Sequence, residues 1–276
     1  MSRVTTVIAT RNRWRDLTVS IPRHEDPVVL VDNGSDDGTP DLVRTHFPWV
    51  RVIEMQRNLG AVARNTGVRA ATTPYVAFAD DDSWWAPGAL DRAAELFDTH
   101  PRLGLLAAAI RVGQDERLDP VCAAMARSPL PAEPDLPGRS VLGFVACGSV
   151  VRRDAYLAAQ GFDEVVEFAG EEERLAMDLA GLGWGIAYVE EVVAHHHPSN
   201  LREGGAARRA RLARNQLLTA VMRRPWPVVA RAAWALALTG AAERRGVAQA
   251  VPRLRLAVAR RAVVPLRVEA RLRLLP

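Results

Sequence analysis

The sequence predicts an α/β fold: a mostly parallel sheet flanked by helices, followed by a C-terminal helical extension. Short apolar runs alternate with polar, helix-like segments four times within residues 4–82, and the connections between them are short. Beyond residue 200 the chain is rich in Arg and Leu and reads as helices. Alternation of this kind is typical of right-handed βαβ units that build one parallel sheet. With 276 residues, 49% of them apolar, the chain can bury a substantial core.

The first four predicted strands are near-continuous apolar runs, as expected of strands covered on both faces. They span residues 4–9, 27–32, 50–55 and 75–79, and the helices between them span residues 14–20, 40–45 and 61–70. Polar clusters follow three of the strands, at residues 10–12, 32–35 and 80–82. Ligands bind outside the carboxyl ends of such strands, so the clusters together predict one site. The first turn lacks G-x-G-x-x-G, which argues against NAD or FAD.

Three consecutive carboxylates, Asp80, Asp81 and Asp82, follow the apolar run 75–79 directly. Adjacent carboxylates repel one another, so a cation or several hydrogen-bond donors must compensate them in the folded protein. Mg²⁺ and Mn²⁺ prefer oxygen ligands and keep positions open for substrate phosphates, which suits one or two of these residues. The alternative is an acidic turn that caps the helix predicted to begin near residue 87.

The second half of the chain continues with a helix over residues 88–99 and an apolar strand over residues 103–112. Residues 113–140 contain five prolines and predict a long loop, which we interpret as part of a lid over a second substrate. We expect further strands over residues 141–151 and 185–189, with a short helix near residues 154–160 between them.

Glu171, Glu172 and Glu173 begin a predicted helix. Glutamates in a first turn interact favourably with the helix dipole, and that structural role is one explanation of the motif. The other is that one of them is a general base for a substrate hydroxyl. Three consecutive histidines, residues 195–197, follow the last predicted strand and cannot all face one metal in an extended chain. Either one, or two with alternate spacing, point at the site, or they are surface residues.

Charge is distributed unevenly along the chain. Residues 1–200 carry 19 Arg against 29 Asp and Glu, whereas residues 201–276 carry 17 Arg against 3 Glu. A basic segment on an acidic body suggests an anionic partner: a phospholipid surface, a polyprenyl phosphate or nucleic acid. Residues 254–273 mix Arg with Leu and Val at amphipathic spacing, which suits a membrane-surface helix. The alternative is a helical subdomain packed on the sheet with its arginines in solvent.

Composition excludes several other classes. The chain has no Lys, which rules out Walker-type phosphate loops and Schiff-base chemistry. Cys122 and Cys147 have no metal-ligand spacing, so we expect buried thiols and a reducing, cytoplasmic location. No run is long enough to span a bilayer, and the N-terminus does not resemble a signal peptide. Aromatic and basic residues do not interleave as in nucleic-acid binders, so we expect no nucleic-acid partner.

Five ordered motifs resemble those of the family 2 inverting glycosyltransferases, which have the Rossmann-like GT-A fold. They are VIATRNR, VDNGSDDGT, NLGAVARNTGV, YVAFADDD and GEEERLAMDL, and the resemblance covers roughly residues 3–200. It implies a GT-A nucleotide-sugar transferase domain over residues 1–200 and leaves residues 201–276 as a basic helical extension. The Gln-x-x-Arg-Trp motif and membrane helices of processive polysaccharide synthases are absent, which points to single-sugar addition.

The resemblance also implies roles for individual residues. Asp32 would read the nucleobase with Thr10 and Arg11 nearby, and Asn58 and Arg64 would approach the nucleotide or its diphosphate. Asp80 and Asp82 resemble the D-x-D pair around Asp81, the first near the ribose and the second on Mn²⁺ or Mg²⁺. His195 or His197 would complete the metal site. The acid pair is Glu171-Glu172, where the family has Glu-Asp, so Glu172 stands at the base position.

The implied reaction is direct displacement, in which an acceptor hydroxyl attacks the anomeric carbon and the nucleotide diphosphate leaves. The family pattern around Asp32 leans towards a UDP- or dTDP-sugar as donor; the acceptor is a glycan, a lipid-linked molecule or a small molecule. A degenerate relative that binds nucleotide or membrane without turnover is the main alternative. A sugar nucleotidyltransferase is disfavoured, because VIATRNRW lacks the glycine-rich basic loop that those enzymes use.

Overall fold

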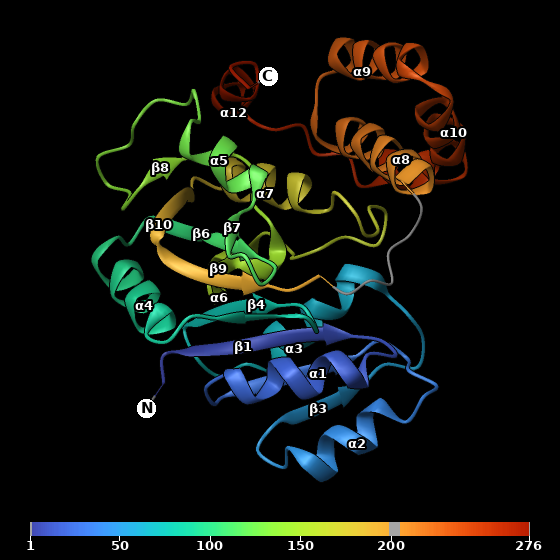
Figure 1. Cartoon of the computed structure of the whole chain (residues 1–276). Coiled ribbons are helices and arrows are strands. Elements are labelled where there is room, and N and C mark those ends of the chain that lie inside the picture. Colours follow the sequence, from blue (N-terminus) through green and yellow to red (C-terminus); the bar gives the residue numbers. More distant parts are fainter. Residues whose placement is uncertain (1, 199–204, 276) are drawn as a thin grey trace.

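The computed structural model describes residues 2–198 and 205–275. Its first half is the parallel sheet that the sequence predicts, with strand order β3-β2-β1-β4 (Figure 1). The strands are β1 (Val4–Thr10), β2 (Val28–Asp32), β3 (Arg51–Glu54) and β4 (Tyr75–Ala79). The connecting helices are α1 (Trp14–Ser20), α2 (Thr39–His46) and α3 (Ala63–Ala70), with short 3₁₀ turns η1 (Ile21–Arg23) and η2 (Gly60–Val62). The predicted strand and helix alternation is confirmed here.

Beyond β4 the same sheet becomes mixed. It continues through β9 (Ser149–Arg152), β6 (Leu103–Val112), β10 (Gly185–His196) and β5 (Ser83–Trp85). β9 runs antiparallel to both of its neighbours, and β5 runs antiparallel to β10, while β6 and β10 are parallel. The expectation of one parallel sheet therefore holds for the first four strands. In the second half some strands run antiparallel to their neighbours, and the pattern of apolar residues along the sequence does not reveal strand direction.

Two predicted segments differ from the structure. Residues 113–140 contain β7 (Arg117–Leu118), α5 (Pro120–Ala126) and β8 (Arg139–Ser140), so they are not one structureless loop. The strand predicted over residues 141–151 is confined to β9, after a 3₁₀ turn η3 (Ala146–Gly148). This apolar run is buried irrespective of its backbone conformation, and burial alone does not distinguish strand from coil.

Helices cover both faces of the sheet. On one face α4 (Ala89–Thr99) packs against β6 and β10, and on the other lie α3, α6 (Arg153–Ala158) and α7 (Glu172–Gly181). Phe78 of β4 and Tyr156 of α6 meet at a ring-centroid distance of 5.5 Å inside the second of these layers. β4 packs in both layers and α7 in the second, and these are the elements that carry the acidic motifs.

The C-terminal segment is helical, as predicted. It contains α8 (Gly205–Arg223), α9 (Trp226–Thr239), α10 (Ala241–Ala250), η4 (Val251–Arg253), α11 (Leu254–Ala259) and α12 (Leu266–Leu272) (Figure 1). The amphipathic segment predicted over residues 254–273 is broken between α11 and α12, and Val264, Val268 and Leu272 pack against Met177 of α7. The predicted boundary at residues 200–201 lies outside the described residues. Among the helices of residues 2–198 and 205–275, we find none long and apolar enough to cross a bilayer.

Arginines of this segment pair with carboxylates of the preceding body. Arg223 contacts Asp178, Arg260 contacts Asp163 at 2.8 Å, and Arg271 contacts Glu133 at 2.8 Å. Glu167 takes two partners, Arg214 and Arg253. Part of the charge asymmetry in the sequence is therefore neutralised within the chain itself.

Candidate active site

The polar loops after β1, β2 and β3 are joined by hydrogen bonds. Asn12 donates from its backbone to Ser35 Oγ at 2.9 Å, and its side chain exchanges two hydrogen bonds with Asp36. Asn33 accepts from the Leu59 backbone at 2.7 Å and donates to the Gly60 carbonyl at 2.9 Å. These contacts bring the three loops together at the carboxyl edge of the sheet, where the prediction placed the clusters after β1, β2 and β4.

Thr10 and Asp32 are neighbours in the β1–β2 register, and both are buried. The Asp32 carboxylate accepts from the Gly34 and Ser35 backbones at 3.1 and 2.8 Å and from Ser35 Oγ, so it holds the turn after β2. Gly34 has φ +77°, and an added Cβ would lie 3.2 Å from the Arg57 backbone, so this turn requires glycine. Arg11 is exposed and donates from Nε to the Gly34 carbonyl at 3.2 Å.

Arg64 is the buried cation of this region. It lies on α3 with 5% exposure and donates from Nη2 to Asp80 Oδ1 at 2.5 Å. Burial by itself lowers the pKa of Arg64, but the charges of Asp80 and Glu171 outweigh it and raise that pKa above its ordinary value. Asn58 is exposed, and its side chain accepts from the Gly60 backbone at 2.8 Å. Arg64 thus lies among the carboxylates, whereas Asn58 lies at the protein surface.

The three aspartates have different partners. Asp80 pairs with Arg64, Asp81 accepts from Thr10 Oγ1 at 3.2 Å, and Asp82 Oδ1 lies 3.2 Å from His196 Nε2. Burial, and then the charges of Asp80 and Asp82, raise the pKa of Asp81 to about 8. Negative charge is in excess here, as the sequence predicts.

The three glutamates lie at the start of α7. Glu171 is 1% exposed, and neither of its carboxylate oxygens has a hydrogen-bond partner. Burial raises the pKa of Glu171, and the neighbouring charge of Glu172 raises it further. Burial also raises the pKa of Glu172, although backbone N–H groups, including that of Ala146, donate to its carboxylate and oppose the shift. Burial raises the pKa of Glu173 to about 7. Carboxylates in this state can accept a proton at neutral pH.

The histidines are arranged differently from the prediction. The strand β10 extends to His196, and His196 is the residue that faces Asp82. His195 Nδ1 lies 2.9 Å from Glu116 and His197 Nε2 lies 3.7 Å from the same carboxylate, while the backbone N–H of His197 donates to the Asp82 carbonyl at 2.9 Å. Successive strand residues point to opposite faces, and β10 has a register shift between Val189 and Val193, so a count from the predicted strand does not tell which histidine faces the site. The expectation for His195 and His197 is therefore revised in favour of His196.

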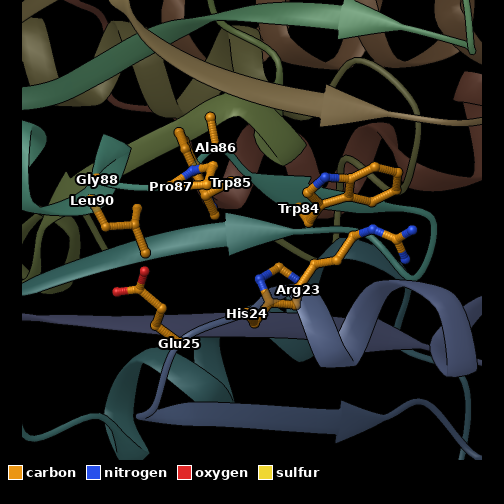
Figure 2. Close-up of a pocket in the computed structure, with 9 residues that line it drawn as sticks. All are labelled: Arg23, His24, Glu25, Trp84, Trp85, Ala86, Pro87, Gly88 and Leu90. Carbon is orange, nitrogen blue, oxygen red and sulfur yellow. The ribbon is translucent and has the colours of Figure 1, made fainter.

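Trp84 of β5 packs beside the two other histidines. Its ring centroid lies 5.6 Å from that of His195 and 4.7 Å from that of His197, and the guanidinium of Arg23 lies 4.6 Å from it. Figure 2 shows Arg23 against Trp84 at one end of a cavity of about 290 Å³. Buried His24 also lines this cavity, and burial lowers its pKa to about 4. The residues that line this cavity include neither the three aspartates after β4 nor the glutamates of α7.

The donor atoms fit a divalent cation. One ligand atom each from Asp80, Cys147 and His196 lie within 4.8 Å of one another, and Asp82 reaches the same imidazole. The excess of carboxylates supplies the charge that a cation would neutralise. His196, Cys147, Asn33 and Glu116 were not singled out as site residues from the sequence. Only a correct end for β10 could have identified His196.

The sequence model described as "Glycosyl transferase family 2" matches residues 5–158, which is more than half of the chain. The chain belongs to glycosyl transferase family 2. This transferase is 30% identical over 207 residues to the N-acetylglucosaminyl-diphospho-decaprenol L-rhamnosyltransferase of Mycobacterium tuberculosis, covering 63% of this chain and 67% of the relative. It is 33% identical over 212 residues to the pre-mycofactocin glycosyltransferase of the same organism, covering 72% and 44%.

Solved structures share the fold of this glycosyltransferase. The mannosyltransferase PcManGT of Pyrobaculum calidifontis, in complex with GDP-Man and Mn²⁺, has a TM-score of 0.61 at 22% identity, covering 94% of this chain and 83% of that one. Residues 1–349 of S. aureus TarS, in complex with UDP-GlcNAc, have a TM-score of 0.64 at 16% identity, covering 98% and 83%. These neighbours confirm the predicted GT-A fold.

Proposed function

We propose that this glycosyltransferase moves one sugar from a nucleotide diphosphate sugar to an acceptor hydroxyl by direct displacement, with inversion at the anomeric carbon. The observation that carries the proposal is the convergence of the β4 end, the β10 end and the α7 start. There Arg64 pairs with Asp80, His196 faces Asp82, and Glu172 is half-buried with a raised pKa. A half-buried base beside a cation site suits the deprotonation of an alcohol.

Each residue has a proposed task. Glu172 takes the proton of the acceptor hydroxyl as its oxygen attacks the anomeric carbon, and burial together with the charge of Asp80 keeps the pKa of Glu172 raised, with Glu171 beside it. Arg64 and Asn58 approach the diphosphate, while Thr10, Arg11 and Asp32 shape the nucleoside pocket, with Asp81 beside it. Asp80, Asp82 and His196 would hold Mn²⁺ or Mg²⁺. When bound, that ion offsets the negative charge that develops on the departing diphosphate.

We propose a UDP- or dTDP-sugar as donor and a lipid-linked acceptor. TarS binds UDP-GlcNAc and PcManGT binds GDP-Man, so nucleotide sugars are the ligands of structural neighbours. The name of the M. tuberculosis rhamnosyltransferase specifies a decaprenol-linked substrate, which supports a lipid carrier over a free glycan or small molecule. We further propose that the chain works in the cytoplasm, at the inner face of the membrane, with residues 1–200 as its transferase domain.

Calorimetric titration tests the nucleotide site. We would titrate UDP, dTDP and GDP with and without Mn²⁺ into the wild type and into Asp82→Ala. Metal-dependent binding of one nucleotide, lost in the variant, supports the proposal and identifies the donor nucleotide. If no nucleotide binds, the aspartates are structural and the proposal is wrong.

Turnover by Glu172→Gln tests the base. We expect the rate to fall by about 10²- to 10⁴-fold while nucleotide affinity is kept, because the amide cannot accept the proton. Glu190→Gln, at an exposed position of β10, is the matched control and should retain full turnover. A wild type that binds nucleotide but transfers no sugar would instead indicate the degenerate alternative.

The surface that we propose for membrane contact is α9. Trp226, Trp234 and Leu238 are 54%, 70% and 66% exposed, and Arg231 is the one charged residue in this helix. The next helix adds the exposed Arg244 and Arg245. Tryptophan and arginine together suit the headgroup region of an anionic bilayer, where the indole is partly buried and the guanidinium meets phosphate.

Vesicle sedimentation tests this surface. Wild-type protein should sediment with phosphatidylglycerol vesicles, and the double variant Trp226→Ser/Trp234→Ser should not. Trp49→Ser removes another exposed tryptophan, 40% exposed between α2 and β3, and should bind as the wild type does. Equal binding by all three proteins would place the membrane contact elsewhere.

A further inference from the structure

Cys147 lies inside the proposed metal site. Its Sγ is within 4.8 Å of a carboxylate oxygen of Asp80 and of an imidazole nitrogen of His196, and the residue is 2% exposed. The three residues come from distant parts of the sequence: the end of β4, the turn η3 and the end of β10. Their donor atoms are spaced closely enough to share one ion, and they include one atom each of oxygen, nitrogen and sulfur.

The turn η3 fixes the position of this thiol. An added Cβ on Gly148 would lie 2.4 Å from a side-chain carbon of Ile110, so the backbone of the turn is packed tightly against β6. On the other side of Cys147, the Ala146 backbone N–H donates to the Glu172 carboxylate. The short turn therefore places the sulfur beside the metal site and a donor beside the proposed base.

The charges around the sulfur favour a bound cation. The negative charges of Asp80, Asp82 and Glu172 lie near the sulfur, and Arg64 is the positive charge near it. A buried sulfur in such surroundings stays a neutral thiol when no cation is bound to it. When a metal ion binds, it binds the thiolate, and the thiol proton is released to solvent.

We infer that Cys147 is a ligand of the metal centre and that it shifts the preference of this centre from Mg²⁺ towards softer ions. The inference rests on the metal site of the proposed function and goes beyond it, because the D-x-D pair and His196 would accept Mn²⁺ or Mg²⁺ without sulfur. Thiolate and imidazole suit Zn²⁺, Co²⁺ and Fe²⁺, while Mg²⁺ prefers oxygen ligands. A mixed set should therefore bind Co²⁺ more tightly than Mg²⁺.

The second cysteine is a natural control. Cys122 is also buried, but its Sγ accepts from the Ile110 backbone at 3.3 Å and contacts the Ala108 carbonyl at 3.6 Å. It therefore has backbone partners in the core. A replacement there removes an equally buried thiol without changing the proposed metal site.

Cobalt titration of the full chain, followed by absorption spectroscopy, tests the inference. The wild type and Cys122→Ser should show the visible bands of bound Co²⁺ together with a near-ultraviolet sulfur-to-cobalt charge-transfer band. In Cys147→Ser we expect the charge-transfer band to disappear and Co²⁺ affinity to fall at least about tenfold. Even the loss of a residue that only supports a metal ligand typically lowers metal affinity by about tenfold or more. Mg²⁺ affinity should change less than about twofold, since magnesium gains little from sulfur.

The outcomes separate the two proposals. Visible cobalt bands without a charge-transfer band, and with equal Co²⁺ affinity in Cys147→Ser, would overturn the role of Cys147 and leave the metal site standing. No cobalt binding by the wild type would overturn both. If Cys147→Ser unfolds, Cys147→Ala with its unfolding curve measured beside the spectra distinguishes loss of fold from loss of the ligand.

Discussion

Glu173 shows how burial, opposed by the charge of Arg224, sets the protonation of a carboxylate next to the proposed base. Burial raises its pKa from 4.5 to about 7 in the folded protein. The folded state therefore keeps a proton that the unfolded state loses as pH rises from about 4.5 to about 7, and the folded state loses stability across that window. We expect Glu173→Gln to remove this dependence and to be more stable than the wild type at pH 8 by about 1–3 kcal/mol.

Urea unfolding of the wild type and of Glu173→Gln at pH 5 and pH 8 measures this effect. The exposed Glu190→Gln is again the control, and its pH dependence should follow that of the wild type. A Glu173→Gln curve parallel to the wild type at both pH values would show that burial does not control this carboxylate.

Single residues also show what the sequence could and could not predict about the site. Asp80, Asp82, Arg64 and Glu172 follow motifs, and the structure brings them together because β4 ends, and α3 and α7 begin, at one edge of the sheet. His196 depends on where β10 ends, and Cys147 depends on how η3 packs. No local pattern encodes either feature, because both result from contacts between distant segments.

Among the elements, α7 connects the proposed site to the C-terminal helices. Asp178 near its end pairs with Arg174, which is 2% exposed, and with Arg223 of α8. Asp178→Asn leaves two largely buried guanidinium groups without their anion, so we expect a loss of about 3–5 kcal/mol in the free energy of unfolding. Asp115→Asn breaks an exposed pair with Arg117 and should cost less than about 1 kcal/mol. Thermal unfolding compares the two variants; equal losses would contradict the argument.

Element boundaries were predictable where one strand carries a continuous apolar run. The range of β4 matches the prediction, as does that of β6, and both are buried along most of their length. The prolines of residues 113–140 predict one long loop, and this prediction is wrong because the segment contains β7, α5 and β8. Pro120 instead occupies the first turn of α5, a position at which its missing N–H costs nothing.

At the scale of the whole molecule, the uneven charge of the chain lets ion pairs join its acidic body to its basic C-terminal segment. The sequence suggested an external anionic partner for the basic segment, but several of its arginines pair with body carboxylates such as Glu133 and Glu167. The arginines left for lipid are fewer, and those that we propose lie around α9. Net charge indicates that a segment meets anions without showing whether they belong to the same chain.

The two parts also share a core, which predicts how the molecule unfolds. Val165 and Val166 of the body are fully buried among Leu217, Leu218 and Val221 of α8, and the arginine pairs surround this contact. Separating the parts would expose apolar surface and leave carboxylates without counterions on the same face. We therefore expect one cooperative transition in scanning calorimetry, with equal calorimetric and van't Hoff enthalpies. Replacing Val166 by Asp should lower the melting temperature of that single transition. Two resolved transitions in the wild type would show that residues 205–275 fold independently of the transferase body.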